Sequence, residues 1–406
     1  MTPLTVVHGA TQLARPRSGT VETVPDAAVA IEDGAVAATG PTDEVTREYP
    51  PENADTAVDA SKQTLLPGFV DPHTHAVFAG DRADEFTAKL RGKSYQEIMA
   101  EGGGILRTVR AVREASRETL VSNLCGHLDT MLAHGTTTVE VKSGYGLSVD
   151  AEVKLLEAIA EADDRHPVDL VATFMGAHAV PEGQGADEYV DSVVERQIPA
   201  VADQGVATFC DVFCEHGVFS VEQSRRVLEA GREAGLAPKI HAEEFERIGG
   251  AGLAADLEAV SADHLLQATA SDAEALAEAG VTPVMLPGTA FTLDTPYADP
   301  ELFASAGSDV AVATDFNPNC FSQSMEFALD LACHGMRMAP GDALRGATAV
   351  AGDALALDDG TGTLDAGAPG DLVVADVPDY EHLSYNFGVS NTQTVLKGGE
   401  VVYSAG

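Results

Sequence analysis

The chain has 406 residues, with 24 lysine and arginine residues against 64 aspartate and glutamate residues, and a formal net charge of −40. A charge of this size and sign argues against nucleic acid and against an anionic membrane surface as partners. Hydrophobic residues form 45% of the chain, which is enough for a large core, and no uninterrupted apolar run reaches the length that spans a membrane.

Only seven of the basic residues are lysines. A dense acidic surface with few lysines indicates adaptation to high salt, where screening removes most of the self-repulsion; the alternative is an ordinary acidic enzyme. The five cysteines are an odd and sparse set, so we expect no disulfide framework and predict a reducing cytoplasm. The first residues lack the basic start and the apolar segment of a signal peptide.

Both ends of the chain have the pattern of short strands separated by turns. Residues 29–40 predict a hairpin with an Asp-Gly turn, and the last part of the chain repeats the order strand, turn, strand. We therefore predict that residues 1–64 and 355–406 pair into one small β-sandwich domain beside a larger domain of residues 65–354.

Strand-like and helix-like segments alternate through the central part of the chain. The strand candidates are Pro67–His75, Thr136–Ser143, Asp169–His178, Thr208–Glu215, Pro238–Glu243, Val260–Leu265, Thr282–Leu286 and Val310–Phe316. Eight β-then-α units predict a (β/α)₈ TIM-like barrel, an α/β fold whose active site lies at the C-terminal ends of the strands. The alternative is an open doubly wound sheet, which needs a glycine-rich phosphate turn after an early strand. The glycine cluster Gly102–Gly104 instead follows a helical stretch.

Polar side chains gather at the predicted C-terminal ends of these strands, which meet at one mouth of a barrel. The first strand ends in His73 and His75, and a strand of period two directs both to the same side. The later strand ends contribute Lys142, Tyr145, His178, Glu215, His241, Glu243, Glu244, Asp263, His264, Asp315 and Asn317. A single histidine is most often structural, but histidines and acids at equivalent positions of several strands indicate one shared metal site.

The predicted metal ligands are three imidazoles and one carboxylate, those of His73, His75, His241 and Asp315, and they leave one position open for water. His264 is either a fifth ligand or a hydrogen-bond donor beside the metal. The cysteines form no second pair that would complete a zinc cage, and we expect most of them to be buried.

Several longer motifs extend beyond these strand ends. They are Leu66–His75, Arg82 with Glu85-Phe86, Gly102–Val109, His134–Leu147, Thr173–Pro181, Asp211–Glu215, His241–Phe245, Ser261–Leu265, Pro287–Phe291 and Ala313–Pro318. Through nearly its whole length, the chain resembles the imidazolonepropionases, a family of the amidohydrolase superfamily. The motif Leu66–His75 alone indicates only the superfamily, whereas Lys142–Leu147 and Gly176–Pro181 are much more specific for the imidazolonepropionases.

The resemblance implies hydrolysis of 4-imidazolone-5-propanoate to N-formimidoyl-L-glutamate in histidine degradation, one zinc or iron ion per chain on the four ligands named above, and a homodimer. The implied substrate contacts are Arg82, Tyr95, Tyr145, His178, Glu244, Asn317, Asn319 and Cys320. The family usually has glycine in place of Asn319 and serine or threonine in place of Cys320. A side chain at a glycine position is strained where φ is positive, and a thiol is a weaker hydrogen-bond partner than a hydroxyl.

The implied reaction gives three residues catalytic roles. Asp315 contacts the metal and accepts a proton from water, whose pKa the metal lowers. His264 donates to the developing oxyanion, and Glu244 carries a proton to the ring nitrogen. Arg82 and the two tyrosines bind the propionate. The fourth strand ends in Glu215 without the carboxylated lysine of many two-metal relatives, so we expect one metal, with Glu215 at a second metal as the alternative.

Two other functions stay open at this stage. A related deaminase or cyclic amidase acting on another small heterocycle would share the metal site, although Arg82 and the tyrosines favour a substrate that carries an acid. A non-catalytic barrel that serves as a scaffold is the other alternative. Such chains typically lose metal ligands, whereas this chain has all four.

Overall fold

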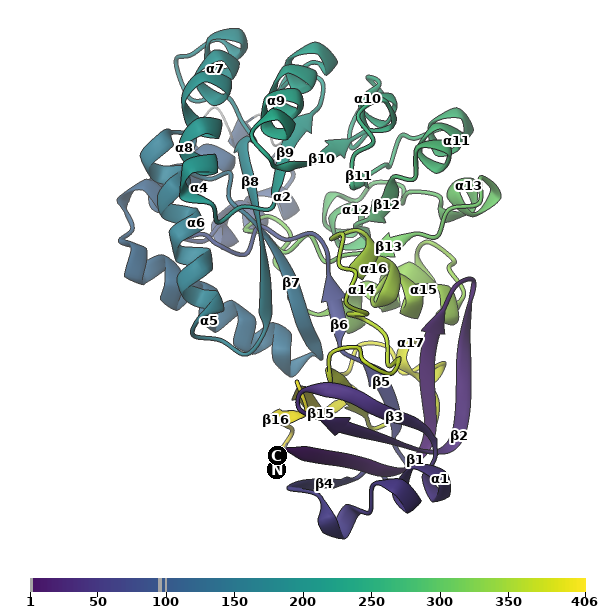
Figure 1. Cartoon of the computed structure of the whole chain (residues 1–406). Helices are drawn as coiled ribbons and strands as arrows, with labels where there is room; N and C mark the ends of the chain where they lie inside the picture. The colour runs from purple at the N-terminus through teal and green to yellow at the C-terminus, as the bar shows by residue number, and fades with distance from the viewer. Residues whose placement is uncertain (1–2, 94–96, 99–100) are drawn as a thin grey trace.

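The structure is a computed structural model that describes residues 3–93, 97–98 and 101–406. Tyr95, a predicted substrate contact, lies outside these described residues. Two sheets of eight strands each organise the described chain, a large one surrounded by helices and a smaller one that contains both termini (Figure 1).

The large sheet is the predicted barrel. Its strands are parallel and follow one another in chain order, each hydrogen-bonded to the next. They are β6 Phe69–Asp71, β7 Thr136–Lys142, β8 Asp169–Ala177, β9 Phe209–Cys214, β10 Ala237–Ala242, β11 Ser261–His264, β12 Thr282–Met285 and β13 Ala311–Val312. The predicted α/β barrel is therefore confirmed.

The predicted first strand, Pro67–His75, is interrupted in the structure. Only Phe69–Asp71 pairs in the barrel sheet, and the next residue, Pro72, has no N–H to donate to a ladder. His73 and His75 therefore lie beyond the end of β6, in a short extended segment that the rest of the barrel must hold in place.

That segment closes the barrel between its first and last strands. The amide of His75 donates to the carbonyl of Phe316 at 2.9 Å, and the amide of Asp315 donates to the carbonyl of His73 at 3.2 Å. Thr74 and Phe316 form an isolated parallel bridge. Closure of the barrel thus brings the predicted metal ligands His73 and His75 next to Asp315.

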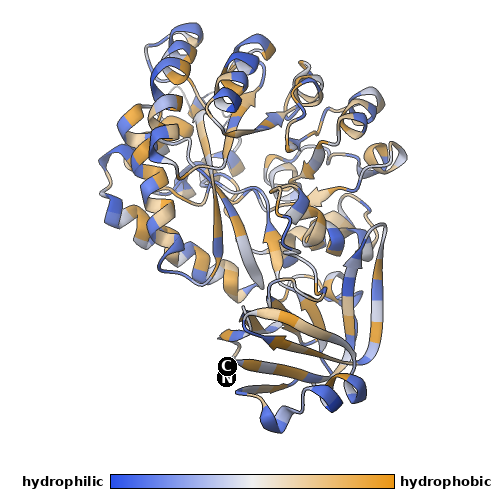
Figure 2. Ribbon diagram, in the orientation of Figure 1, coloured by the Kyte–Doolittle hydropathy of each residue, from blue (hydrophilic) through white to orange (hydrophobic). Residues whose placement is uncertain are grey.

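Helices connect the strands and cover the outside of the barrel (Figure 1). They are α2 Ala83–Leu90, α4 Ile105–Glu114, α5 Arg117–Ala133, α6 Val149–Asp163, α7 Ala186–Ser192, η2 Val193–Gln197, α8 Ile198–Gln204, α9 Val221–Glu233, α10 Gly250–Asp256, α11 Ala270–Ala279, α12 Pro287–Leu293, α13 Pro300–Ser305, α14 Met325–His334, α15 Pro340–Gly346 and α16 Ala349–Asp353. Hydrophobic and hydrophilic residues alternate along them (Figure 2). In α9, for example, Val227, Leu228 and Gly231 are buried, a spacing that puts them on one face.

The N- and C-terminal segments form the small sheet, as predicted. Its order is β16-β15-β14-β5-β1-β2-β3, with β4 paired to β1. The elements are β1 Leu4–Arg17, β2 Thr20–Glu32, β3 Ala35–Pro41, α1 Thr42–Glu48, η1 Pro51–Asn53, β4 Thr56–Asp59, β5 Thr64–Pro67, β14 Leu372–Ala375, α17 His382–Tyr385, β15 Thr392–Lys397 and β16 Glu400–Ser404. The predicted hairpin is β2 and β3.

The small sheet is one continuous sheet that folds over its own core, not two separate sheets. Ile31 on β2, Leu65 on β5 and Leu396 on β15 share this core, although they lie far apart along the strand order. The backbone of Val36 on β3 also exchanges two hydrogen bonds of 2.8 Å with the segment before β14. The two halves therefore face each other as the layers of a sandwich do.

The chain crosses from the small sheet to the barrel at Gly68, between β5 and β6. A Cβ at this position would lie 2.2 Å from Oγ1 of Thr137, so the close approach requires glycine. The division into residues 1–64 with 355–406 and residues 65–354 stays a prediction. Among the described residues, none of the helices combines the length and the apolar character needed to cross a bilayer.

Candidate metal centre and active site

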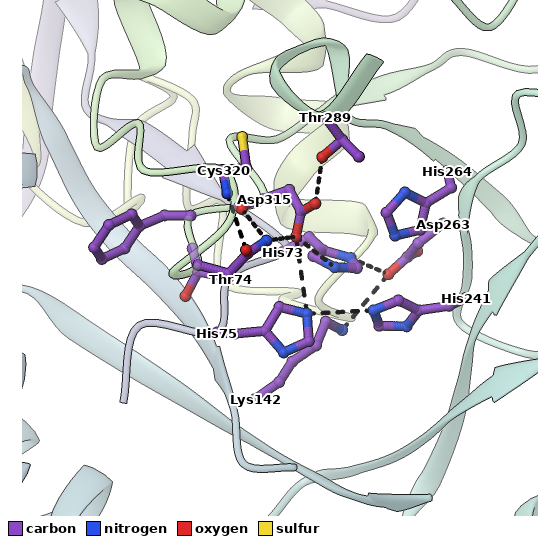
Figure 3. A network of polar contacts seen from close by, with 12 residues as sticks. His73, Thr74, His75, Lys142, His241, Asp263, His264, Thr289, Asp315 and Cys320 are labelled. Atoms are coloured by element: carbon purple, nitrogen blue, oxygen red, sulfur yellow. Dashed lines mark hydrogen bonds and ion pairs between the residues drawn. The ribbon is translucent and has the colours of Figure 1, made fainter. Parts of the chain in front are cut away.

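The four predicted metal ligands meet at the C-terminal mouth of the barrel (Figure 3). Nε2 of His75 lies 3.3 Å from Nε2 of His241 on β10. Oδ1 of Asp315 lies 3.6 Å from Nε2 of His73 and 3.8 Å from Nε2 of His75. All four side chains are buried. Residues remote in sequence thus form one compact cluster.

The three histidines fit a single metal ion. Their ligating nitrogens lie within 4.8 Å of one another, and two nitrogens that bind one tetrahedral zinc stand about 3.4 Å apart. Nε2 of His73 is buried without a hydrogen-bond partner in the described chain, and a metal would satisfy it. Burial holds the pKa of His73 and His75 well below its usual value, so both rings are neutral, the form that binds metals.

Two buried aspartates orient the histidine ligands. Nδ1 of His73 lies 2.6 Å from Oδ2 of Asp263, and Nδ1 of His241 lies 3.1 Å from Oδ1 of Asp211. A carboxylate accepts, so each ring keeps a hydrogen on Nδ1 and directs the lone pair of Nε2 to the metal. Neither aspartate was predicted from the sequence to orient a metal ligand. The available signal for Asp211 was an acid inside the apolar strand β9, which is costly unless it has a partner.

A buried lysine links the two aspartates. Nζ of Lys142 on β7 donates to Asp211 at 2.7 Å and to Glu140 at 2.9 Å, and it lies 3.5 Å from Asp263. Burial alone would lower the pKa of Lys142, but the three carboxylates outweigh burial and raise that pKa. Lys239 also approaches Glu140, at 3.1 Å. The charges under the metal site therefore compensate one another inside the barrel.

His264 and Glu244 stand next to the ligand cluster. The ring centroid of His264 lies 5.3 Å from that of His73 and 5.0 Å from that of His241, and its Nε2 lies 3.7 Å from Oε2 of Glu244. Burial raises the pKa of Glu244 well above its usual value, and the charge of Asp315 adds to the shift. The pair places a hydrogen-bond donor and a carboxyl of raised pKa beside the metal ligands.

Several residues of this mouth have left-handed backbone conformations without being glycine. The φ angles are 55° at Glu243, 78° at His264, 59° at Leu265 and 52° at Asp315. Such conformations cost of order 1–3 kcal/mol each and gather where a site needs a fixed geometry. The concentration here marks the strand ends of β10, β11 and β13 as the functional edge of the barrel.

Two predicted substrate contacts, His178 and Tyr145, border the metal ligands. The ring of His178, after β8, stacks on that of His75 with centroids 4.7 Å apart and an interplanar angle of 18°. The ring of Tyr145, after β7, lies 5.2 Å from His178 and 5.9 Å from His75. These aromatic side chains form one wall beside the cluster.

Arg82 lies at the start of α2, and the structure does not show it touching the cluster. Its Nε donates to Glu85 at 2.7 Å, and both side chains are buried. Nζ of Lys89, at the other end of α2, donates to Oδ1 of Asn319 at 2.7 Å. The helix that carries Arg82 therefore lies against the loop that follows β13.

That loop is tied to Asp315 by Asn317. Nδ2 of Asn317 donates to Oδ1 of Asp315 at 3.0 Å, and its Oδ1 accepts from the amides of Asn319 and Cys320. Asn319 is not among the residues with positive φ, so the absence of the family's glycine causes no strain there. The thiol of Cys320 is buried against the carbonyl of Thr314 at 3.7 Å.

Glu215, the alternative ligand for a second metal, is engaged with the backbone. Its carboxylate accepts from the amide of Phe245 at 2.8 Å and from that of Glu246 at 3.3 Å. No group of potential metal ligands in the described chain includes Glu215. Its contacts instead fix the loop that follows β10 and carries Glu244.

Comparisons with known proteins agree with this geometry. The amidohydrolase family model matches residues 64–402, and a model of the bacterial imidazolonepropionase-like composite domain matches residues 27–51. A protein named imidazolonepropionase from Haloarcula marismortui is 63% identical over 98% of this chain and 95% of the relative. Relatives of the same name are 62% identical in Halobacterium salinarum, over 99% and 98%, and 46% identical in Geobacillus kaustophilus, over 98% and 95%.

Solved structures share the fold at much lower identity. A triazine hydrolase variant has a TM-score of 0.78 at 16% identity and covers 99% of this chain and 95% of its own. A zinc-bound adenosine deaminase from Xanthomonas campestris has a TM-score of 0.74 at 18% identity, over 98% and 92%. Both similarities extend over nearly the whole of this chain, and so over the barrel and the small sheet together. From the family match and the close relatives, the chain belongs to the amidohydrolase family and, within it, to the imidazolonepropionases.

Proposed function

We propose that the chain hydrolyses the ring amide of 4-imidazolone-5-propanoate and releases N-formimidoyl-L-glutamate, in the degradation of histidine. One observation carries the proposal: a cluster of three histidines and one aspartate, bordered by His178 and Tyr145, in a chain 63% identical to a protein named imidazolonepropionase. One zinc or iron ion per chain would bind to the four ligands His73, His75, His241 and Asp315.

Asp315 is the proposed base of the reaction. When bound, the ion supplies Lewis acidity that lowers the pKa of a water molecule. Burial raises the pKa of the Asp315 carboxyl to about 6, which brings its basicity closer to neutral pH. Thr289 donates to Oδ2 of this carboxylate and Asn317 donates to Oδ1. Both contacts hold the carboxylate with Oδ1 facing His73 and His75, where the base must stand.

His264 and Glu244 are the proposed partners of the substrate's amide. A ring N–H of His264 donates to the oxygen that gains negative charge when the carbonyl is attacked. Glu244 has the raised pKa that a proton donor at neutral pH needs, and it delivers its proton to the leaving ring nitrogen. The 3.7 Å between the two side chains allows both to reach one small ring.

The propionate arm is assigned to Arg82 with Tyr95 and Tyr145. A guanidinium offers a fork of donors that suits a carboxylate, and Glu85 already fixes the Nε edge of Arg82. His178 and the loop residues Asn317, Asn319 and Cys320 complete the proposed contacts. Support comes from α2 lying against that loop, through Lys89 and Asn319.

We further propose a homodimer, from the family resemblance, and a cytoplasmic location, from the five free cysteines. Function in high salt is proposed from the net charge of −40 and from the identity of 62–63% to relatives in two halophilic archaea. An alternative substrate has weaker support, because an adenosine deaminase and a guanine deaminase that share the fold are only 18% and 16% identical.

The test is an activity assay on freshly prepared imidazolone propionate in high salt, with adenosine and guanine as competing substrates. Turnover of the first compound alone supports the proposal, and turnover of a purine alone would reject it. Asp315→Asn should abolish turnover while the chain stays folded. An unchanged rate in that variant would contradict the role of Asp315 as the base, whereas no turnover by the wild type would favour the non-catalytic scaffold.

A further inference from the structure

A buried carboxylate on α6 has no role in the reaction described so far. Glu152 is fully buried and forms no ion pair within the described chain. Its Oε2 accepts from the amide of Gly144 at 2.9 Å, and its Oε1 accepts from the amides of Gly146 and Leu147, each at 2.7 Å. Burying a carboxylate is costly without such charge-assisted bonds, so Glu152 and this loop fix each other. The loop carries Tyr145.

The loop also determines where the hydrogen of His178 lies. Nδ1 of His178 is 3.2 Å from the carbonyl oxygen of Gly144. A carbonyl only accepts, so Nδ1 carries a hydrogen and Nε2 of the neutral ring presents a lone pair. Gly144 must be glycine for this contact, because its φ is +94° and a Cβ would lie 2.9 Å from Nδ1 of His178.

The ring of His178 lies beside the metal ligands with its Nε2 edge unengaged in the described chain. One face of its ring stacks on the metal ligand His75, with centroids 4.7 Å apart, and Tyr145 lies 5.2 Å away. The Gly144 carbonyl occupies the Nδ1 edge, and within the described chain no hydrogen bond to Nε2 is observed. The side chain is only half-buried, so Nε2 is the polar atom left for a ligand.

We propose that Glu152 is a positioning residue for ring opening. By holding Gly144–Leu147, it keeps His178 in the Nδ1–H tautomer, with Nε2 as an acceptor for an N–H of the substrate ring, and it keeps Tyr145 in place. The site then selects heterocycles with a ring N–H at that edge over rings with a lone pair there. The identity of the substrate rests on the proposed function, whereas the tautomer does not.

The tautomer is tested by ¹⁵N NMR on the zinc-loaded protein with ¹⁵N-labelled histidine, with the His178 signals assigned from their loss in His178→Asn. The expected wild-type result is a protonated Nδ1 and an unprotonated Nε2. In Glu152→Gln, the His178 signals should shift toward a mixture of tautomers. A wild-type His178 protonated at Nε2 would overturn the inference without any activity measurement.

Kinetics test the positioning role. Glu152→Gln keeps the shape, but its NH₂ group meets an amide donor, so at least one loop contact is lost. We expect kcat/KM to fall on the order of tenfold to a hundredfold, mainly through KM, with metal per chain unchanged. The control is Glu157→Gln on the same helix, a half-buried residue whose carboxylate lies 3.4 Å from Arg117, which should behave as wild type. A wild-type KM in Glu152→Gln would overturn the proposal.

A second variant keeps the test decisive if Glu152→Gln does not fold. Gly144→Ala leaves Glu152 in place and pushes on His178 directly, so KM should rise without loss of metal; an unchanged KM would contradict the proposal. Failure of the proposed function looks different, because the wild type would then not open imidazolone propionate while the NMR result still decides the tautomer.

Discussion

Removing the carboxylate behind His73 tests how the metal site is built. Asp263 lies 2.6 Å from Nδ1 of His73 and accepts from Ser261 at 2.6 Å. Asparagine has the same shape but only a neutral oxygen, and its NH₂ group can turn to Nδ1 and move the ring hydrogen to Nε2. Losing such an outer partner typically lowers metal affinity 10- to 100-fold, about 1.4–2.8 kcal/mol of binding free energy.

The assay is competition for zinc between Asp263→Asn and a chromogenic chelator, with metal content measured on the same samples. The control is Glu326→Gln, which alters a buried carboxylate that accepts from Asn391 at 2.7 Å and Thr392 at 3.2 Å. The control should lower the free energy of unfolding by about 1–3 kcal/mol without lowering zinc affinity. An affinity of Asp263→Asn within threefold of wild type, or an equal loss in Glu326→Gln, would refute the orienting role.

Four further predictions concern the proton donor, the propionate contact, the metal and the salt dependence. Glu244→Gln should lower kcat on the order of 10²- to 10⁴-fold with metal retained, and a wild-type kcat in this variant would contradict the role of Glu244 as acid. Because the pKa of Glu244 is raised, the wild-type rate should fall on the alkaline side, where this proton is lost. Arg82→Lys keeps the charge but loses the fork, so KM should rise about tenfold with kcat nearly unchanged; an unchanged KM would count against the propionate contact. A chelator should abolish turnover and lower Tm, and added zinc or iron should restore both, whereas full activity without metal would contradict the account. Lowering salt should reduce the free energy of unfolding, because less screening leaves the net charge of −40 to repel itself; equal stability in low salt would reject that adaptation.

The fold was predictable because short strand-like segments, most of them followed by polar residues, recur through the central part of the chain. The alternation of strand and helix patterns gives the barrel, and the barrel brings the strand ends to one mouth. His73, His75, His241 and Asp315 could therefore be grouped from sequence alone, and the structure places them together. The interruption at Pro72 did not disturb this grouping, because barrel closure holds the segment after it.

The residues that support the metal ligands and the loop around Tyr145 could not be predicted from the sequence, for physical reasons. Asp211 acts on His241 of the neighbouring strand, whereas Asp263 on β11 acts across the barrel on His73, which follows β6. Lys142 joins the two aspartates in the barrel interior, so these contacts depend on the curvature of the closed sheet. Glu152 looks like an ordinary acid in the first turn of a helix, where acids are favoured. Its burial depends on the loop that folds back over it.

The proposed function is tested most directly by loading the wild-type chain with zinc or iron and measuring turnover of imidazolone propionate against metal content in high salt. We predict activity that rises in proportion to bound metal and reaches its maximum at one ion per chain, with none in Asp315→Asn. A chain that carries its metal but leaves imidazolone propionate intact would contradict the account, as would full activity without metal.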